Sequence, residues 1–259
     1  MRPRALPDIE FIELEPPRPR PAPPTDLLAV DRLNVMYGSR FAVRAASLRV
    51  RRGEVVALIG HNGCGKSSML RAIFGLTPAA SGSVHFESTN LTESVGVASG
   101  RGIGLVPDAR AVFADLRVRE NLLLGAGPAT RPEVVDARLA EALARFPEMG
   151  DWLERPAGEL SGGQQRVVSI ALALMGAPRL LLLDEPTKHL APAFIGRVVR
   201  SVRALADRDG LGVLIAEVNV GAVVTIADRV YAMRDGVIGS EKTGAEMLAA
   251  GPTSWWALF

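Results

Sequence analysis

The sequence has little cysteine, little net charge and no long apolar segment, and each shortage narrows what the protein can be. Its one cysteine, Cys64, rules out a disulfide within the chain and is typical of a reducing compartment. The 30 basic and 28 acidic residues give a formal net charge of +2, which does not favour nucleic acid as a partner. No apolar run approaches the ~18–20 residues of a membrane-spanning helix, and the opening residues 1–11 lack the apolar centre of a signal peptide. We therefore expect a soluble cytoplasmic protein, so any membrane channel that it serves must be another chain.

Proline is concentrated at the N-terminus, where residues 1–24 hold eight of the 18 prolines. Proline lacks a backbone N–H and has a fixed φ, so this segment suits neither a helix interior nor a central strand. We expect residues 1–25 to form a disordered tail rich in proline and arginine. A tail that binds acidic lipid or a partner protein is the alternative.

Residues 26–250 are expected to form one α/β domain, because 48% of the chain is apolar and its length can bury a large core. Alternating apolar residues at 33–37 and 46–50 predict an antiparallel strand pair. Short apolar runs separated by helical segments predict a parallel sheet with crossover helices. The runs are residues 55–59, 102–106, 180–183 and 212–216, with helices at 66–74 and 193–206.

Two further segments complete the expected architecture. Residues 111–176 are mainly helical in pattern and predict a helical lobe inserted into the α/β core, with breaks at 125–132 and 146–150. Near the C-terminus, Asp235-Gly236 predicts a hairpin turn, and Thr243 with Glu246 predicts a capped helix. Residues 251–259 form an apolar tail that we expect to cover the core or a partner.

The segment from Gly60 to Ser67 matches the phosphate-binding pattern G-x-x-x-x-G-K-[ST], directly after a predicted strand and before a predicted helix. Glycines let the backbone N–H groups turn towards phosphate oxygens, and the helix N-terminus adds partial positive charge. Lys66 would neutralise the β- and γ-phosphates and Ser67 would ligate Mg²⁺, so ATP and Mg²⁺ are the predicted cofactors. The alternative is a glycine-rich turn without a ligand. The predicted nucleotide-binding residues here are Gly60, His61, Asn62, Gly63, Cys64 (as a small filler), Gly65, Lys66, Ser67 and Ser68.

Two acids, Asp184 and Glu185, follow the apolar run at 180–183. The carboxyl end of a parallel strand lies at the ligand crevice, so both acids are expected beside the phosphates. Asp184 suits the metal, and Glu185, on the other side of the pleat, is the predicted base for the attacking water. Acids commonly end strands, so this pattern alone is weak evidence for a metal or catalytic site. Together with the phosphate loop it becomes strong evidence.

The third motif is Leu160-Ser161-Gly162-Gly163-Gln164, which we call the signature. Ser161 is a good N-cap with Gln164 at the capping-box position, and an ordinary capped helix would explain these residues. The order of all three motifs, however, resembles the ABC ATPase family over about residues 27–248. The resemblance implies a P-loop NTPase core, with a mixed sheet, an antiparallel β edge and an inserted helical subdomain. It also implies that Ser161, Gly162, Gly163 and Gln164 contact the γ-phosphate held by a second subunit in a head-to-tail dimer, and that Tyr37 stacks on adenine.

Residues 106–113 and 216–219 are similar to the matching segments of LivF-like ATPases of branched-chain amino-acid importers, including an acid, Asp108, at the Q-loop position. This implies an ATP-hydrolysing subunit that drives import of amino acids, urea or amides. The implied partners are membrane permease subunits and a second ATPase, identical or different, on the inner face of the cell membrane. Asp108 is a further candidate metal contact.

Two departures from the pattern matter. Val218 stands where this family has a histidine or glutamine switch residue, and Lys188-His189 stands where leucine-glycine is expected. A regulatory subunit with weak hydrolysis is therefore one alternative. A soluble ABC ATPase acting on nucleic acid or ribosomes is another, but residues 68–160 are too few for the long coiled coil of the repair type, and the chain has one cassette.

These departures predict that one composite site of the assembled dimer turns over slowly, because valine can neither contact a phosphate nor orient Glu185. The test is to mutate the catalytic glutamate of each paired subunit in turn and to measure ATP turnover. Equal residual rates from the two single mutants would contradict the prediction.

Overall fold

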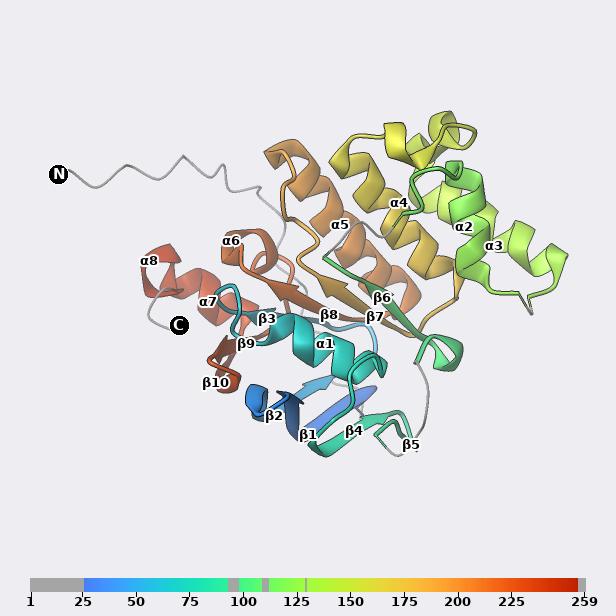
Figure 1. Cartoon of the computed structure of the whole chain (residues 1–259). Coiled ribbons are helices and arrows are strands. Elements are labelled where there is room, and N and C mark those ends of the chain that lie inside the picture. The colour runs from blue at the N-terminus through green and yellow to red at the C-terminus, as the bar shows by residue number, and fades with distance from the viewer. Residues whose placement is uncertain (1–25, 93–97, 109–111, 129, 256–259) are drawn as a thin grey trace.

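The structure is a computed structural model that describes residues 26–92, 98–108, 112–128 and 130–255 (Figure 1). The predicted tail at 1–25 and the last four residues of the apolar C-terminal tail, 256–259, lie outside the described residues, as does Ala111, the expected start of the helical lobe. Two sheets form the centre of the molecule.

The first sheet is antiparallel, with the strand order β2-β1-β4-β5. Strands β1 (Leu28–Tyr37) and β2 (Arg40–Val50) pair antiparallel, which confirms the predicted strand pair. Strands β4 (Ser81–Phe86) and β5 (Thr89–Asn90) were not predicted. Only Val84 and Phe86 of β4 are buried, so the apolar alternation is too short to be recognised without its neighbour β1.

The second sheet has the order β10-β9-β3-β8-β7-β6. Its five strands from β9 to β6 pair in parallel, and β10 pairs antiparallel with β9 at the edge, so the predicted mixed sheet is confirmed. The bounds are β3 (Val55–Ile59), β6 (Ile103–Val106), β7 (Leu180–Asp184), β8 (Gly212–Glu217), β9 (Arg229–Arg234) and β10 (Val237–Thr243). Every residue of β3, β7 and β8 is buried, as expected for strands covered on both faces.

Successive residues of these strands face two different cores. Leu181 and Leu183 belong to the core that includes the long helices, whereas Leu180 and Leu182 belong to the core shared with the antiparallel sheet. Figure 1 shows α1 (Lys66–Phe74) on one face of the parallel sheet and α4 (Gly162–Met175) and α5 (Pro192–Asp209) on the other.

The chain between β6 and β7 is mainly helical, with α2 (Val118–Ala126), α3 (Pro132–Arg145), α4 and two short 3₁₀ turns at 147–152 and 157–159. The gap between α2 and α3 corresponds to the expected break at 125–132, whereas residues 146–161 between α3 and α4 form a longer interruption than the expected 146–150. A Cβ at Gly125 would lie 2.1 Å from the Leu172 carbonyl oxygen, so glycine lets α2 and α4 approach closely. Buried Asn121 accepts from Phe113 N–H and donates to the Phe113 and Arg117 carbonyls, which ties α2 to the preceding loop.

The C-terminal elements follow the sequence signals. The β9–β10 turn has positive φ at Asp235 (49°) and Gly236 (84°), as the predicted hairpin turn requires. Thr243 and Glu246 form the predicted capping box at the start of α7 (Gly244–Ala250), and the short α6 (Val220–Val223) precedes β9. Trp255, in α8 (Pro252–Trp255), is buried and donates through Nε1 to the Met247 carbonyl at 2.7 Å. Within the described ranges, no helix combines the length and apolarity needed to cross a bilayer.

Burial predicts the effect of two leucine-to-alanine changes. Leu182→Ala in β7, where the side chain is fully buried, should lower the free energy of unfolding by about 2–5 kcal/mol because it leaves a cavity in the core. Leu248→Ala on α7, where the side chain is 39% exposed, should change it by no more than about 0.5 kcal/mol. Urea denaturation of both variants measures the difference, and similar midpoints would contradict the placement of Leu182.

Candidate active site

The phosphate loop, residues 60–67, connects β3 to α1, and its glycines are required by close backbone contacts. A Cβ at Gly60 would lie 2.3 Å from the Met233 carbonyl oxygen, and one at Gly65, where φ is +114°, would lie 2.2 Å from the Ala42 carbonyl oxygen. The Gly236 N–H donates to the Cys64 carbonyl at 2.8 Å, which anchors the loop to the β9–β10 turn. The loop is thus fixed by its backbone, whereas His61, Asn62 and Gly63 at its tip are exposed.

Cys64 fills space inside this loop. The residue is 7% exposed, and burial raises the pKa of its thiol. A protonated, buried thiol is a poor nucleophile, so the packing role expected from the sequence fits the structure.

Lys66 is the first residue of α1, and its side chain is buried. Its Nζ donates to the carbonyls of Gly60 at 2.9 Å and His61 at 3.1 Å, and lies 3.9 Å from Glu185 Oε1. Because the N-cap residue Gly65 provides no side chain, the first N–H groups of α1 receive no side-chain cap. The ammonium and the helix N-terminus together form an anion site.

Ser67 and Asp184 meet beside this anion site, as predicted. Ser67 Oγ donates to Asp184 Oδ1 at 2.9 Å, although the two residues are far apart in the sequence. Burial raises the pKa of Asp184, against the lowering effect of the Ser67 hydrogen bond, and the charge of Glu185 raises it further. Hydroxyl and carboxylate oxygens are ligands that Mg²⁺ accepts, and it usually completes its shell with water and phosphate oxygens.

Glu185 lies directly after β7 and is 7% exposed. It was expected opposite Asp184 on the pleat, but β7 ends at Asp184 and Glu185 has a positive φ of 45°. This left-handed turn, rather than strand alternation, brings its carboxylate towards Lys66. A second cation, Lys188, places Nζ 2.9 Å from Glu185 Oε2.

Asp108, a candidate metal contact from the sequence, forms an ion pair with Lys188 at 2.8 Å between Oδ2 and Nζ. Arg166 of α4 holds the same segment by donating to the carbonyls of Pro107 at 2.9 Å and Asp108 at 3.3 Å. Hydrogen bonds to Asp108 and then to Glu185 raise the pKa of Lys188, so the side chain stays charged. Across the part of the chain that is described, no group of three or more His, Cys, Asp or Glu side chains could hold a metal ion.

Sequence reasoning missed the role of Glu217. This buried carboxylate ends β8 and accepts hydrogen bonds from the backbone N–H groups of Thr187 at 2.8 Å and Val218 at 2.9 Å. It also accepts from the Thr187 hydroxyl and the Asn219 N–H. Glu217 therefore links the loop after Glu185 to the turn that carries Val218. The sequence signal that could have identified Glu217 is its position directly after the apolar run at 212–216, which matches the position of Asp184 after the run at 180–183.

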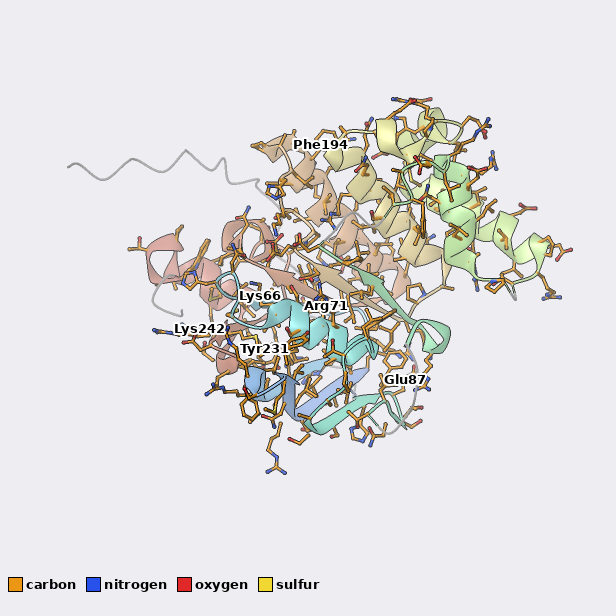
Figure 2. All side chains as sticks on the ribbon, viewed as in Figure 1. Lys66, Arg71, Glu87, Phe194, Tyr231 and Lys242 are labelled. Carbon is orange, nitrogen blue, oxygen red and sulfur yellow. The ribbon has the colours of Figure 1, made fainter. Side chains whose placement is uncertain are left out.

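The signature forms the predicted helix cap. Ser161 Oγ accepts from Gln164 N–H at 3.3 Å, and Gln164 Oε1 accepts from Ser161 N–H at 2.9 Å. A Cβ at Gly163 would lie 2.6 Å from the Phe194 ring, whereas Gly162 faces open space. Figure 2 shows Phe194 well apart from Lys66, so the signature does not meet the phosphate loop of its own chain.

Tyr37 stands at the end of β1 and is 50% exposed. Hydrogen bonds with Thr77 and Ser68 lower the pKa of the Tyr37 hydroxyl. Because Ser68 is in α1 and Thr77 follows it, the hydroxyl lies beside this helix. The tyrosine ring is thus accessible and lies next to the phosphate loop, where the family resemblance implies a contact to adenine.

Comparisons with known proteins identify the family that this chain resembles. A family model described as ABC transporter matches residues 43–188. The chain is 38% identical to the high-affinity branched-chain amino acid transport ATP-binding protein BraG of Pseudomonas aeruginosa, over 86% of this chain and 95% of the relative. It is 33% identical to a probable branched-chain amino acid transport ATP-binding protein, LivF, of Archaeoglobus fulgidus, over 86% of this chain and 94% of the relative.

Solved structures show the same fold. A nucleotide-free ATP-binding cassette from an ABC transporter matches with a TM-score of 0.78 and 27% identity, over 88% of this chain and 97% of that chain. The ADP conformation of the cassette MJ1267 matches with a TM-score of 0.78 and 29% identity, over 88% of this chain and 96% of that one.

The contact between Gly163 and Phe194 predicts that alanine substitutions at two neighbouring glycines change the stability of the protein by different amounts. Gly163→Ala should destabilise the protein by about 1–3 kcal/mol, because the new methyl group overlaps the Phe194 ring. Gly162→Ala should have an effect within about 0.5 kcal/mol, because its methyl group enters open space. Thermal unfolding of both variants is the measurement, and equal melting temperatures would show that α5 does not pack against the signature as described.

Proposed function

This chain belongs to the family of ABC transporter ATP-binding proteins, and from that membership we propose that it hydrolyses ATP to drive import of branched-chain amino acids. The observation that carries the catalytic part is the meeting of Lys66, Ser67, Asp184 and Glu185 at one end of the parallel sheet. The substrate class is supported by the two relatives, BraG and LivF, which carry that transport activity in their names.

In the proposed reaction the chain's own groups first bind and orient ATP. The N–H groups of the phosphate loop and the Lys66 ammonium hold the β- and γ-phosphates, and the exposed ring of Tyr37 stacks on adenine. Lys66 exchanges its two carbonyl contacts for phosphate oxygens. Ser67 and Asp184 would hold Mg²⁺, which when bound neutralises charge developing on the phosphate oxygens.

Glu185 is the proposed base. Its carboxylate accepts a proton from the attacking water while the new O–P bond to the γ-phosphorus forms and the bond to the β–γ bridging oxygen breaks. The products are ADP and inorganic phosphate. Burial of Glu185 within ion-pair distance of Lys66 keeps the carboxylate in the site before nucleotide enters.

The proposed partners follow from the position of the signature. Ser161 and Gly162 are exposed. The neighbouring Gly163 lies against Phe194, which Figure 2 shows apart from Lys66, so a contact of the signature with a γ-phosphate would require a second cassette. We propose a head-to-tail pair of cassettes bound to permease subunits at the inner face of the cell membrane. The apolar side chain of Val218 favours a pair of two different cassettes, in which the partner site is the faster one.

A regulatory subunit with weak hydrolysis is the second candidate, and Val218 is the observation that favours it. Its backbone N–H, and not its side chain, is held by Glu217. A cassette of this kind would bind ATP and hydrolyse it weakly or not at all at its own site, while the partner cassette carries the turnover.

Glu185→Gln should lower ATP turnover by about 10²–10⁴-fold, because the amide cannot accept the proton of the attacking water. ATP binding, followed with a fluorescent ATP analogue, should be retained. The measurement uses the full chain, alone and together with a partner cassette whose own catalytic glutamate is changed to glutamine, so that only the site of this chain is followed. Glu133→Gln on the exposed start of α3 is the matched control. Turnover that persists in Glu185→Gln would contradict the assignment of the base, and no wild-type turnover in any pairing would favour the regulatory subunit.

The transported substrate needs a separate experiment. Uptake of labelled leucine, isoleucine and valine is measured in cells that lack this gene and carry the wild-type or the Glu185→Gln chain. Uptake restored only by the wild-type chain supports the proposal. Equal uptake with either chain would contradict the substrate assignment without affecting the ATPase assignment.

A further inference from the structure

We propose that Lys188 is a positioning residue for ATP hydrolysis, which holds one oxygen of the Glu185 carboxylate and links it to Asp108. The inference rests on the proposed role of Glu185 as the base. Lys188 itself touches neither of the groups that are proposed to bind the phosphates and the metal, Lys66 and Ser67, so its effect on the reaction would be exerted through Glu185.

The geometry is that of a bridging cation. Lys188 Nζ lies 2.9 Å from Glu185 Oε2 and 2.8 Å from Asp108 Oδ2, so one ammonium group joins two loops. The Lys188 N–H also donates to the Glu185 carbonyl at 3.2 Å. This turn, together with the positive φ of Glu185, places the two side chains on the same side of the loop.

The two lysines that contact Glu185 should behave differently once ATP binds. Lys66 contacts the carboxylate through Oε1 at 3.9 Å and is the residue that moves to the phosphates in the proposed reaction. Lys188 binds the other oxygen, Oε2, and its side chain is about one third exposed at the rim of the site. When Lys66 leaves, Oε1 becomes available to the attacking water while Lys188 keeps Oε2 in place.

The turn that carries Val218 offers no substitute for the contact between Lys188 and Glu185. Val218 has no polar side-chain group, and the Glu217 carboxylate is already engaged by Thr187, Val218 and Asn219. Within the described ranges, Lys66 and Lys188 are the cations within ion-pair distance of Glu185. Lys188 therefore supplies the polar support that the switch position of this chain cannot give.

Asp108 extends the link towards the helices between β6 and β7. Its backbone carbonyl accepts from Arg166 on α4, the helix that begins at the signature, while its carboxylate holds Lys188. A movement of this loop thus displaces Lys188 and changes how Glu185 is held. The bridge makes the orientation of the base depend on the position of the loop.

The test compares Lys188→Met, which keeps the length of the side chain and removes its charge, with Lys188→Arg. We expect Lys188→Met to lower kcat about 10- to 100-fold through a misplaced Glu185, with the KM for ATP changed less than about twofold. Lys188→Arg should restore part of the loss because the guanidinium can bridge the same two carboxylates. Lys242→Met, in β10, is the matched control and should keep the wild-type kcat.

Two further measurements separate positioning from other roles. In a Glu185→Gln background, Lys188→Met should cause no additional loss of kcat, because the group that it positions is already absent. Asp108→Asn should lower kcat less than Lys188→Met, and the two changes together should be non-additive. Nucleotide binding and the melting temperature are recorded for each variant, and Lys188→Gln replaces Lys188→Met if the latter does not fold.

The outcomes distinguish this inference from the proposed function. An unchanged or raised kcat in Lys188→Met, or a raised KM at constant kcat, would overturn the positioning role. If Glu185→Gln abolishes turnover and Lys188→Met does not lower it, only the inference about Lys188 fails. If Glu185→Gln retains turnover, the proposed base itself is wrong.

Discussion

The burial of the central parallel strands on both faces is the constraint on which the rest of the molecule depends. Strands β3, β7 and β8 have no exposed position, so they cannot accommodate solvated charge along their length. Their polar residues are therefore displaced to the carboxyl ends, where β3 continues into the phosphate loop, β7 ends in Asp184 and β8 ends in Glu217. The same burial that stabilises the sheet thus concentrates the reactive groups at one edge.

Charges concentrated in this way must be hydrogen-bonded or ion-paired, because an unpaired buried charge is strongly destabilising. Each acid at the edge has a partner: Asp184 accepts from Ser67, Glu185 contacts two lysines, and Glu217 accepts from backbone N–H groups. The site is consequently a network in which the entry of a phosphate replaces existing contacts. The proposed binding of nucleotide therefore exchanges side-chain partners such as those of Lys66 and also occupies the uncapped N–H groups at the start of α1.

Local patterns in the sequence predict the parts of this arrangement that depend on neighbouring residues. The strand pair β1–β2, the buried runs, the capped α4 and the hairpin turn at Asp235-Gly236 were all predicted from spacing and residue type. The pairing of Ser67 with Asp184 followed from the rule that parallel strands place their carboxyl ends at one crevice. The roles of the signature and of Tyr37 came from the family resemblance, because a capped helix and an exposed tyrosine have ordinary explanations of their own.

The parts that were missed depend on contacts between distant segments or on backbone strain. Strand β4 is too short in apolar alternation to be seen without β1. The ion pair between Asp108 and Lys188 joins residues whose sequence spacing carries no information about their contact, so it was not predicted. The positive φ of Glu185 departs from the extended backbone of a strand, and no residue type in the sequence predicts it.

The packing of Gly163 against Phe194 has a mechanical consequence. Phe194 lies in the first turn of α5, a few residues after the loop that carries Glu185 and Lys188, and its ring leaves no room for even one methyl group at the start of α4. Closely packed interiors transmit displacement and do not absorb it. A displacement of the signature would therefore be passed through Phe194 to the start of α5 and to the preceding loop, which carries Glu185, the proposed base.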